Sequence, residues 1–172
     1  MQDLLFVIDM QNDFIDGALG TKEAVEIVPA VKEKIESFNG KVFFTRDTHY
    51  ENYMETREGR FLPVPHCIKD TDGWQIRPEL DELRNTDAID KPSFGYAGLG
   101  DLLLKLNEED EINSITFIGL CTDICVISNA LLAKATLPEI DIIIDSACCA
   151  GVTPESHNNA LEAMKMCQII VE

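Results

Sequence analysis

The sequence predicts an α/β fold: a three-layer, doubly wound, six-stranded parallel sheet. Two observations lead to this prediction. Apolar runs alternate with amphipathic stretches along the chain, as expected for strands joined by right-handed crossover helices. The run at 4–8, Leu-Leu-Phe-Val-Ile, is continuously apolar, which is typical of a parallel strand buried on both faces. A length of 172 residues fits one domain, 1–172.

Six short runs have the length and composition of strands. The run at 4–8 ends before Asp9, and the run at 114–119 is the strongest of the six. The run at 88–91 is the weakest. In chain order, the predicted strands are residues 4–8, 41–45, 88–91, 114–119, 140–144 and 168–171.

The stretches between these strands show helical spacing of apolar residues, except for one long segment. In the first helix, valines and isoleucine recur at helical intervals until Asn39-Gly40 ends the pattern. The predicted helices are residues 24–38, 99–106, 123–137 and 154–166. Residues 50–84 are rich in proline, glycine and charge and lack clear periodicity. A loop of this length inside a compact domain is usually either functional or evidence against the assigned elements, and the histidine and carboxylate content of this one favours a function.

The charge and composition of the chain exclude several classes of function. The net charge is −17, and no basic stripe is present to neutralise phosphates, so we expect no nucleic-acid partner. The acidic field also slightly favours a neutral substrate. No apolar run approaches the roughly 20 residues that span a bilayer, so we expect no membrane association. Without a signal-peptide pattern, the six cysteines indicate reduced thiols in a cytoplasmic protein.

Reactive side chains collect where the predicted strands end. In a doubly wound sheet, ligands bind beyond the carboxyl ends of the strands. The candidates that follow the first four strands are Asp9, Asp47, His49, Lys91, Cys121 and Cys125. This convergence at one edge of the sheet predicts a functional site there.

Cys121 and Cys125 lie at the turn from the strongest strand into a predicted helix. A helix N-terminus offers a positive dipole end and free backbone amides, so we expect the pKa of a cysteine there to fall below its ordinary value of about 8.5. The same amides can act as an oxyanion hole. The segment alone leaves open that both cysteines only pack in the core. Zinc binding is a weaker alternative, because a structural zinc site needs a second ligand pair.

Three motifs in this order resemble the isochorismatase-like cysteine hydrolases, and they cover nearly the whole chain. They are Val7-Ile8-Asp9-Met10-Gln11-Asn12-Asp13-Phe14, Asp90-Lys91-Pro92-Ser93-Phe94, and the segment Gly119-x-x-Thr122-Asp123-x-Cys125-Val126. The first and last motifs are specific individually, whereas the lysine motif is weak alone.

The resemblance implies a catalytic triad on a six-stranded parallel sheet. Asp9 would accept the proton, Lys91 would support the charges and Cys125 would be the nucleophile. It also implies a non-proline cis peptide at Leu120-Cys121 and an oxyanion hole formed by the amides of Cys121 and Cys125. The alternative interpretation gives these residues no catalytic role. In it, Asp9 caps a strand end or forms an ion pair, and Lys91 is a solvated surface residue.

A second group of residues predicts a metal site. Asp47 and His49 are two residues apart at a strand end, so both side chains can point to one side. His66 can close the site from the long segment. The pattern resembles the metal site of nicotinamidases, in which a glutamate is sometimes a further ligand; Glu58 is the best match and Glu55 the reserve. Such ligands suit one divalent ion, Zn²⁺ or alternatively Fe²⁺ or Mn²⁺. The alternative is that these are ordinary loop residues.

The predicted substrate pocket matches the family pattern only in part. Phe14 matches a pocket aromatic of the family, and Phe94 or Tyr96 would supply another wall. Nicotinamidases often carry an aromatic residue just before the distal histidine motif. Here that stretch reads Leu62-Pro63-Val64-Pro65, with Phe61 slightly further back. This departure leaves the substrate open.

The function implied by the resemblance is amide hydrolysis through a thioester, with nicotinamide as the best-matching small-molecule substrate. Alternatives within the family are another amidase, a carbamoyl or ureido hydrolase, or an isochorismatase-type enzyme. The last needs no cysteine nucleophile, so Cys125 argues against it. A catalytically idle binding or assembly member is a further alternative. The family commonly forms oligomers, so a homo-oligomer is expected.

Three other residues receive structural predictions only. His157 lies early in the last predicted helix and is expected to be exposed or to cap it. Cys148 and Cys149 are expected to be buried packing residues, with the rim of the site as the alternative.

Overall fold

The computed structural model describes all 172 residues and contains one sheet of six parallel strands in the order β3-β2-β1-β4-β5-β6. Each predicted strand is present. The strands are β1 (Gln2–Ile8), β2 (Lys41–Asp47), β3 (Ile89–Lys91), β4 (Ile112–Leu120), β5 (Asp141–Ala150) and β6 (Ile170–Val171). The predicted doubly wound α/β fold is therefore confirmed.

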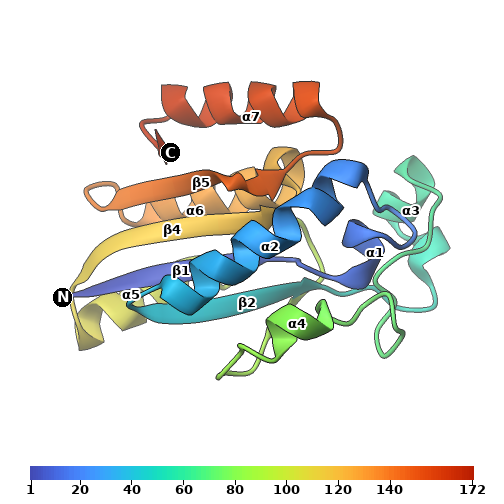
Figure 1. Cartoon of the computed structure of the whole chain (residues 1–172), viewed down its shortest axis with the longest axis horizontal. Coiled ribbons are helices and arrows are strands. Elements are labelled where there is room, and N and C mark those ends of the chain that lie inside the picture. Colours follow the sequence, from blue (N-terminus) through green and yellow to red (C-terminus); the bar gives the residue numbers. More distant parts are fainter.

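Helices cover both faces of the sheet. Figure 1 shows α2 in front of the strands and α5 and α6 behind them. The helices are α1 (Asn12–Ile15), α2 (Lys22–Ser37), α3 (Arg57–Phe61), α4 (Pro78–Asp81), α5 (Leu99–Glu109), α6 (Ile127–Thr136) and α7 (Pro154–Met166). None of them has the length and apolar character that a membrane crossing requires.

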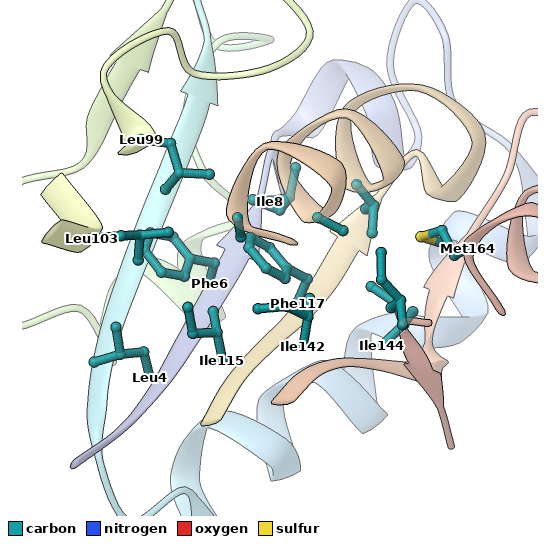
Figure 2. Close-up of a cluster of buried hydrophobic side chains, with 14 of the residues drawn as sticks. Leu4, Phe6, Ile8, Leu99, Leu103, Ile115, Phe117, Ile142, Ile144 and Met164 are labelled. Carbon is teal, nitrogen blue, oxygen red and sulfur yellow. The ribbon is translucent and has the colours of Figure 1, made fainter. Parts of the chain in front are cut away.

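The first strand shows why the apolar run is continuous. Leu4, Phe6 and Ile8 pack into a cluster with residues of α5, α6 and α7, which Figure 2 shows. Leu5 and Val7 point to the opposite face and pack with residues of α2. Successive side chains of a strand alternate between the two faces of the sheet, and helices cover both faces here. All five side chains of residues 4–8 are therefore buried, which explains why the run contains no polar residue.

Two elements differ from the sequence-based prediction. β5 continues to Ala150 because its last residues pair with the end of β4, which places Cys148 and Cys149 in the strand. Both side chains are 4% exposed and pack on opposite faces of the sheet, so the packing prediction is confirmed. The helix predicted at 123–137 begins as a π-helical turn, η2 (Thr122–Val126), before α6. The Val126 amide donates to the carbonyl five residues back, which makes this turn wider than an α-helical one.

The long segment between β2 and β3 is folded against the carboxyl ends of the strands. It contains α3, α4 and a short 3₁₀ turn, η1 (Tyr53–Glu55), and Figure 1 shows α1 and α3 at this same end of the sheet. The Trp74 indole N–H donates to Thr48 Oγ1 at 2.9 Å, and His49 forms a β-bridge with Ile68. The segment therefore forms one wall of the region where ligands bind in such folds.

The strand order reverses between β1 and β4, and Gly119 lies at this switch point. Its φ angle is +113°, and it pairs with Ile8 in the sheet. A Cβ atom at this position would lie 2.1 Å from the Ile8 carbonyl oxygen. Both the backbone conformation and the contact therefore require glycine.

We predict that Gly119→Ala lowers the free energy of unfolding by more than about 2 kcal/mol, because it adds backbone strain to a steric clash. Urea unfolding followed by circular dichroism measures this value. Gly100→Ala is the matched control: it lies in α5, and its nearest contact would be the Thr136 hydroxyl at 3.2 Å. Equal stability of the two variants would contradict the role given to Gly119.

Candidate active site

Asp9, Lys91 and Cys125 come together at the switch point, although they are far apart in sequence. Lys91 Nζ lies 2.6 Å from Asp9 Oδ2 and 3.6 Å from Cys125 Sγ. Asp9 and Lys91 are fully buried, and Cys125 is 5% exposed. Asp9 follows β1, Lys91 ends β3 and Cys125 lies in η2 after β4, so the sheet topology brings the three side chains together.

Neighbouring side chains fix the orientation of this cluster. Thr45 Oγ1 donates to Asp9 Oδ1 at 2.6 Å, so each carboxylate oxygen has its own partner. Lys91 Nζ also donates to the Ser93 carbonyl at 3.1 Å. Asn129 Nδ2 donates to the Cys125 carbonyl at 2.8 Å and thereby holds the turn that carries the thiol.

The electrostatics of the cluster differ from the prediction. Burial and the Asp9 carboxylate raise the pKa of Cys125 well above its ordinary value, and Lys91 offsets this only in part. The lowered cysteine pKa predicted from a helix N-terminus is therefore wrong, because a fully buried thiol loses more solvation than the turn restores. Burial also raises the pKa of Asp9, against the lowering effect of Lys91. The surroundings of Cys125 therefore favour its thiol form over the thiolate.

The turn after β4 contains the cis peptide Leu120-Cys121 implied by the resemblance. The Cys121 carbonyl accepts the amides of Ile124 and Val126, which closes the turn. The amide of Cys121 has no acceptor among the backbone hydrogen bonds of turns and loops. Cys121 is half-buried and lines the central cavity, and burial raises the pKa of its thiol to about 12.

Asp47, His49, Glu58 and His66 form a second cluster, and their ligand atoms all lie within 4.8 Å of one another. The two histidine Nε2 atoms lie 3.0 and 3.4 Å from Asp47 Oδ2, and 3.5 and 3.7 Å from Glu58 Oε1. Ligands about 2.1 Å from a tetrahedral Zn²⁺ are separated by about 3.4 Å. The donor set and its spacing therefore fit a divalent metal ion. The reserve ligand Glu55 is exposed and is not part of this cluster.

The surroundings of this cluster hold its ligands in position. His66 Nδ1 donates to the Val64 carbonyl at 2.8 Å, a tautomer that leaves the Nε2 lone pair free for a metal. The Tyr53 ring packs edge-on against both imidazoles, with centroid distances of 4.8 and 5.1 Å. Gln11 is fully buried; its amide accepts from Asp47 N at 2.7 Å and donates to Asp47 O at 2.8 Å.

Both clusters face one cavity of about 870 Å³. Cys121 and Cys125 line one part of it, and the four clustered ligands line another. Its apolar walls include Phe14 and Phe94, which the sequence placed in the pocket, and also Phe61 and Leu62 from the end of α3. The cavity therefore has aromatic walls although no aromatic residue directly precedes His66.

Two predicted placements are wrong. Tyr96 does not line the cavity: its amide donates to Asn129 Oδ1 at 2.9 Å, and its side chain packs against the core cluster behind the sheet. His157 is half-buried and neither exposed nor a cap. Thr153 caps α7, and His157 Nδ1 lies 2.7 Å from Thr122 Oγ1.

With this geometry established, the family can be assigned. Residues 3–172 match the isochorismatase domain. The chain belongs to the isochorismatase family. The resemblance inferred from the three motifs is therefore confirmed over almost the entire sequence.

Solved structures of this family share the fold over nearly their full length. The pyrazinamidase of Pyrococcus horikoshii in complex with zinc is 29% identical, with a TM-score of 0.82 over 100% of this chain and 99% of that one. The nicotinamidase PncA of Bacillus subtilis is 30% identical, with a TM-score of 0.81 over 99% of each chain. The N-carbamoylsarcosine amidase of Thermoplasma acidophilum is 27% identical, with a TM-score of 0.75 over 100% and 96%.

Three residues that orient the site were not predicted from the sequence. Thr45, Gln11 and Asn129 are buried polar residues that orient the two clusters. Gln11 lies within the first motif, two residues after Asp9, and Asn129 lies one helical turn after Cys125. The signal in the sequence was a polar residue two to four positions away from a reactive one, because such residues often orient it.

We predict that Glu58→Gln weakens Zn²⁺ binding by at least about tenfold, because it removes a charged ligand of the cluster. Isothermal titration calorimetry on metal-free protein measures the affinity and the stoichiometry. Glu55→Gln removes an equal charge three residues away and should bind Zn²⁺ as the wild type does. Equal affinities of the two variants would contradict the assignment of Glu58.

Proposed function

We propose that the chain hydrolyses nicotinamide to nicotinate and ammonia, with Cys125 as the nucleophile. The relatives indicate an amidohydrolase of the isochorismatase family. One observation carries the proposal to this substrate: a single cavity with aromatic walls contains a buried cysteine cluster and, facing the same space, a cluster of metal-ligand side chains. These two clusters can engage opposite ends of one small aromatic amide.

The residues of the cysteine cluster support a thioester mechanism. The Cys125 thiol transfers its proton to Asp9 as its sulfur attacks the amide carbon. Lys91 remains a cation and stabilises the negative charges of the Asp9 carboxylate and of the Cys125 sulfur. The proton then moves from Asp9 to the amide nitrogen, the C–N bond breaks, and ammonia leaves. Water attacks the thioester, Asp9 accepts a proton from that water, and the sulfur leaves and is reprotonated.

The oxyanion formed in each tetrahedral intermediate needs hydrogen-bond donors. We assign this role to the backbone amides of Cys121 and Cys125. One such donor typically contributes about 10²–10³ in rate. The free Cys121 amide beside the cavity supports this assignment.

Asp47, His49, Glu58 and His66 would hold one divalent metal ion, with Zn²⁺ as the first choice and Fe²⁺ or Mn²⁺ as alternatives. A bound metal would supply a coordination position for the nitrogen of an aromatic ring. Phe14 and Phe94 would flank that ring and exclude water from the cavity. A neutral amide also enters this acidic protein without electrostatic repulsion.

A carbamoyl compound is the second candidate substrate. The same cysteine chemistry cleaves the C–N bond of a terminal urea group, and the fold is similar to that of an N-carbamoylsarcosine amidase. Such a substrate has no ring nitrogen, so it gives the cluster of Asp47, His49, Glu58 and His66 no direct role in binding. The dependence of turnover on metal therefore separates the two candidates.

We predict ammonia release from nicotinamide by the zinc-loaded enzyme, lost on chelation and restored by added metal. Cys125→Ala should lower the rate by at least about 10³-fold, because the nucleophile is removed. Cys167→Ala, at an exposed cysteine, is the control and should keep full activity. If the enzyme hydrolyses a carbamoyl compound but not nicotinamide, and does so without metal, the carbamoyl compound is the substrate and the nicotinamide proposal is wrong. Turnover retained in Cys125→Ala would contradict the mechanism.

A further inference from the structure

Thr122 and His157 form a hydrogen-bonded link between the cysteine turn and the last helix. Thr122 is fully buried, and its hydroxyl lies 2.7 Å from Nδ1 of His157 in the first turns of α7. A second link runs parallel to it, because the Val152 amide donates to Asp123 Oδ1 at 3.1 Å. A Cβ atom on Gly151 would lie 2.8 Å from the His157 amide nitrogen, so the loop between β5 and α7 packs closely against the backbone of His157.

The Thr122–His157 hydrogen bond joins a hydroxyl to an imidazole. Burial lowers the pKa of His157, although Asp123 works against this, which favours the neutral ring. A neutral imidazole carries its proton on one nitrogen, so Nδ1 accepts from the hydroxyl in one tautomer and donates to it in the other. We assign the tautomer protonated on Nε2, in which the Thr122 hydroxyl donates to His157 Nδ1.

The hydrogen bond between Thr122 and His157 restrains the backbone next to Cys121. Thr122 directly follows Cys121, whose amide is free and whose carbonyl closes the turn. On the other side, pairing of Leu120 with β5 fixes the end of β4. The Thr122 hydroxyl is therefore the side-chain anchor nearest to Cys121 on its downstream side, and the Asp123 carboxylate is the next one. The hydroxyl touches neither of the two cysteines in the hydrogen-bond network and has no partner other than His157.

We propose that Thr122 and His157 are positioning residues that hold the Cys121 amide toward the reacting carbonyl oxygen. This inference rests on the proposed cysteine-hydrolase mechanism but not on nicotinamide as the substrate. Misplacement of a catalytic group by about 1 Å can cost up to about 10²-fold in rate. Loss of the link should therefore lower kcat about 10- to 100-fold and leave KM nearly unchanged, since ground-state binding does not use the oxyanion donors.

Matched pairs of variants isolate the hydrogen bond from the bulk of the side chains. Thr122→Val keeps the shape of threonine but removes the hydroxyl, whereas Thr122→Ser keeps the hydroxyl. His157→Leu removes the acceptor, whereas His157→Asn places an amide oxygen close to the position of Nδ1. His157 is only half-buried, so its variants report on the link even if Thr122→Val does not fold.

Two probes distinguish this role from a general structural one. Acylation by p-nitrophenyl acetate passes through an oxyanion, whereas alkylation by iodoacetamide consumes the same thiol without one. Cys125→Ala provides the background from the five other cysteines. Neither probe requires the natural substrate, so the test remains valid if nicotinamide is not hydrolysed.

We expect Thr122→Val and His157→Leu to lower the acylation rate by about tenfold or more and to change the alkylation rate less than about twofold. Thr122→Ser and His157→Asn should retain acylation close to that of the wild type. The double variant Thr122→Val/His157→Leu should be no slower than the slower single variant, because both remove one interaction. Equal acylation by Thr122→Val and Thr122→Ser would overturn the proposal. So would parallel losses of acylation and alkylation, or additive effects in the double variant.

Discussion

The buried ion pair between Lys91 and Asp9 is the interaction on which the rest of the site depends. Neither side chain has any exposed surface, and an isolated charge there would cost several kcal/mol. The 2.6 Å contact between them, the Thr45 hydroxyl and the Ser93 carbonyl together compensate for this loss of solvation. The pair also sets the state of Cys125. Burial and the Asp9 carboxylate raise the pKa of Cys125, which favours the protonated thiol, and Asp9 is the neighbouring group that can accept its proton.

Asp47 connects the two clusters and makes them one site. Its Oδ2 atom faces both histidines, while its Oδ1 atom lies 3.8 Å from Lys91 Nζ. Asp47 also pairs with Lys91 in the sheet, so the last residue of β2 and the last residue of β3 hold the two clusters at a fixed separation. Gln11 binds the Asp47 backbone on the remaining side. The register of β2 and β3 thus sets the separation between Lys91 and the cluster of Asp47, His49, Glu58 and His66.

Much of this arrangement was predictable because it follows from periodicity and topology. Residues 4–8 are apolar without interruption because both faces of β1 are buried, and the ends of β1 to β4 meet at one edge. What the sequence did not reveal depends on packing between distant elements. The inward position of His157 depends on its contact with Thr122, and Tyr96 packs against the core cluster behind the sheet. The π-helical turn differs, because a local hydrogen bond from the Val126 amide to the Cys121 carbonyl closes it. The pKa of Cys125 was mispredicted for the same reason, since local sequence shows a helix start but does not show full burial.

If Cys125 is the nucleophile, an aromatic amide substrate acylates it, and the resulting thioester can be observed. Zinc-loaded enzyme would be mixed with nicotinamide, quenched in acid within the first turnovers, digested and analysed by mass spectrometry. We expect a nicotinoyl group on the peptide that contains Cys125 and on no other cysteine peptide. Rapid turnover with an unmodified Cys125 peptide, or acylation of Cys121 in its place, would show that Cys125 is not the nucleophile.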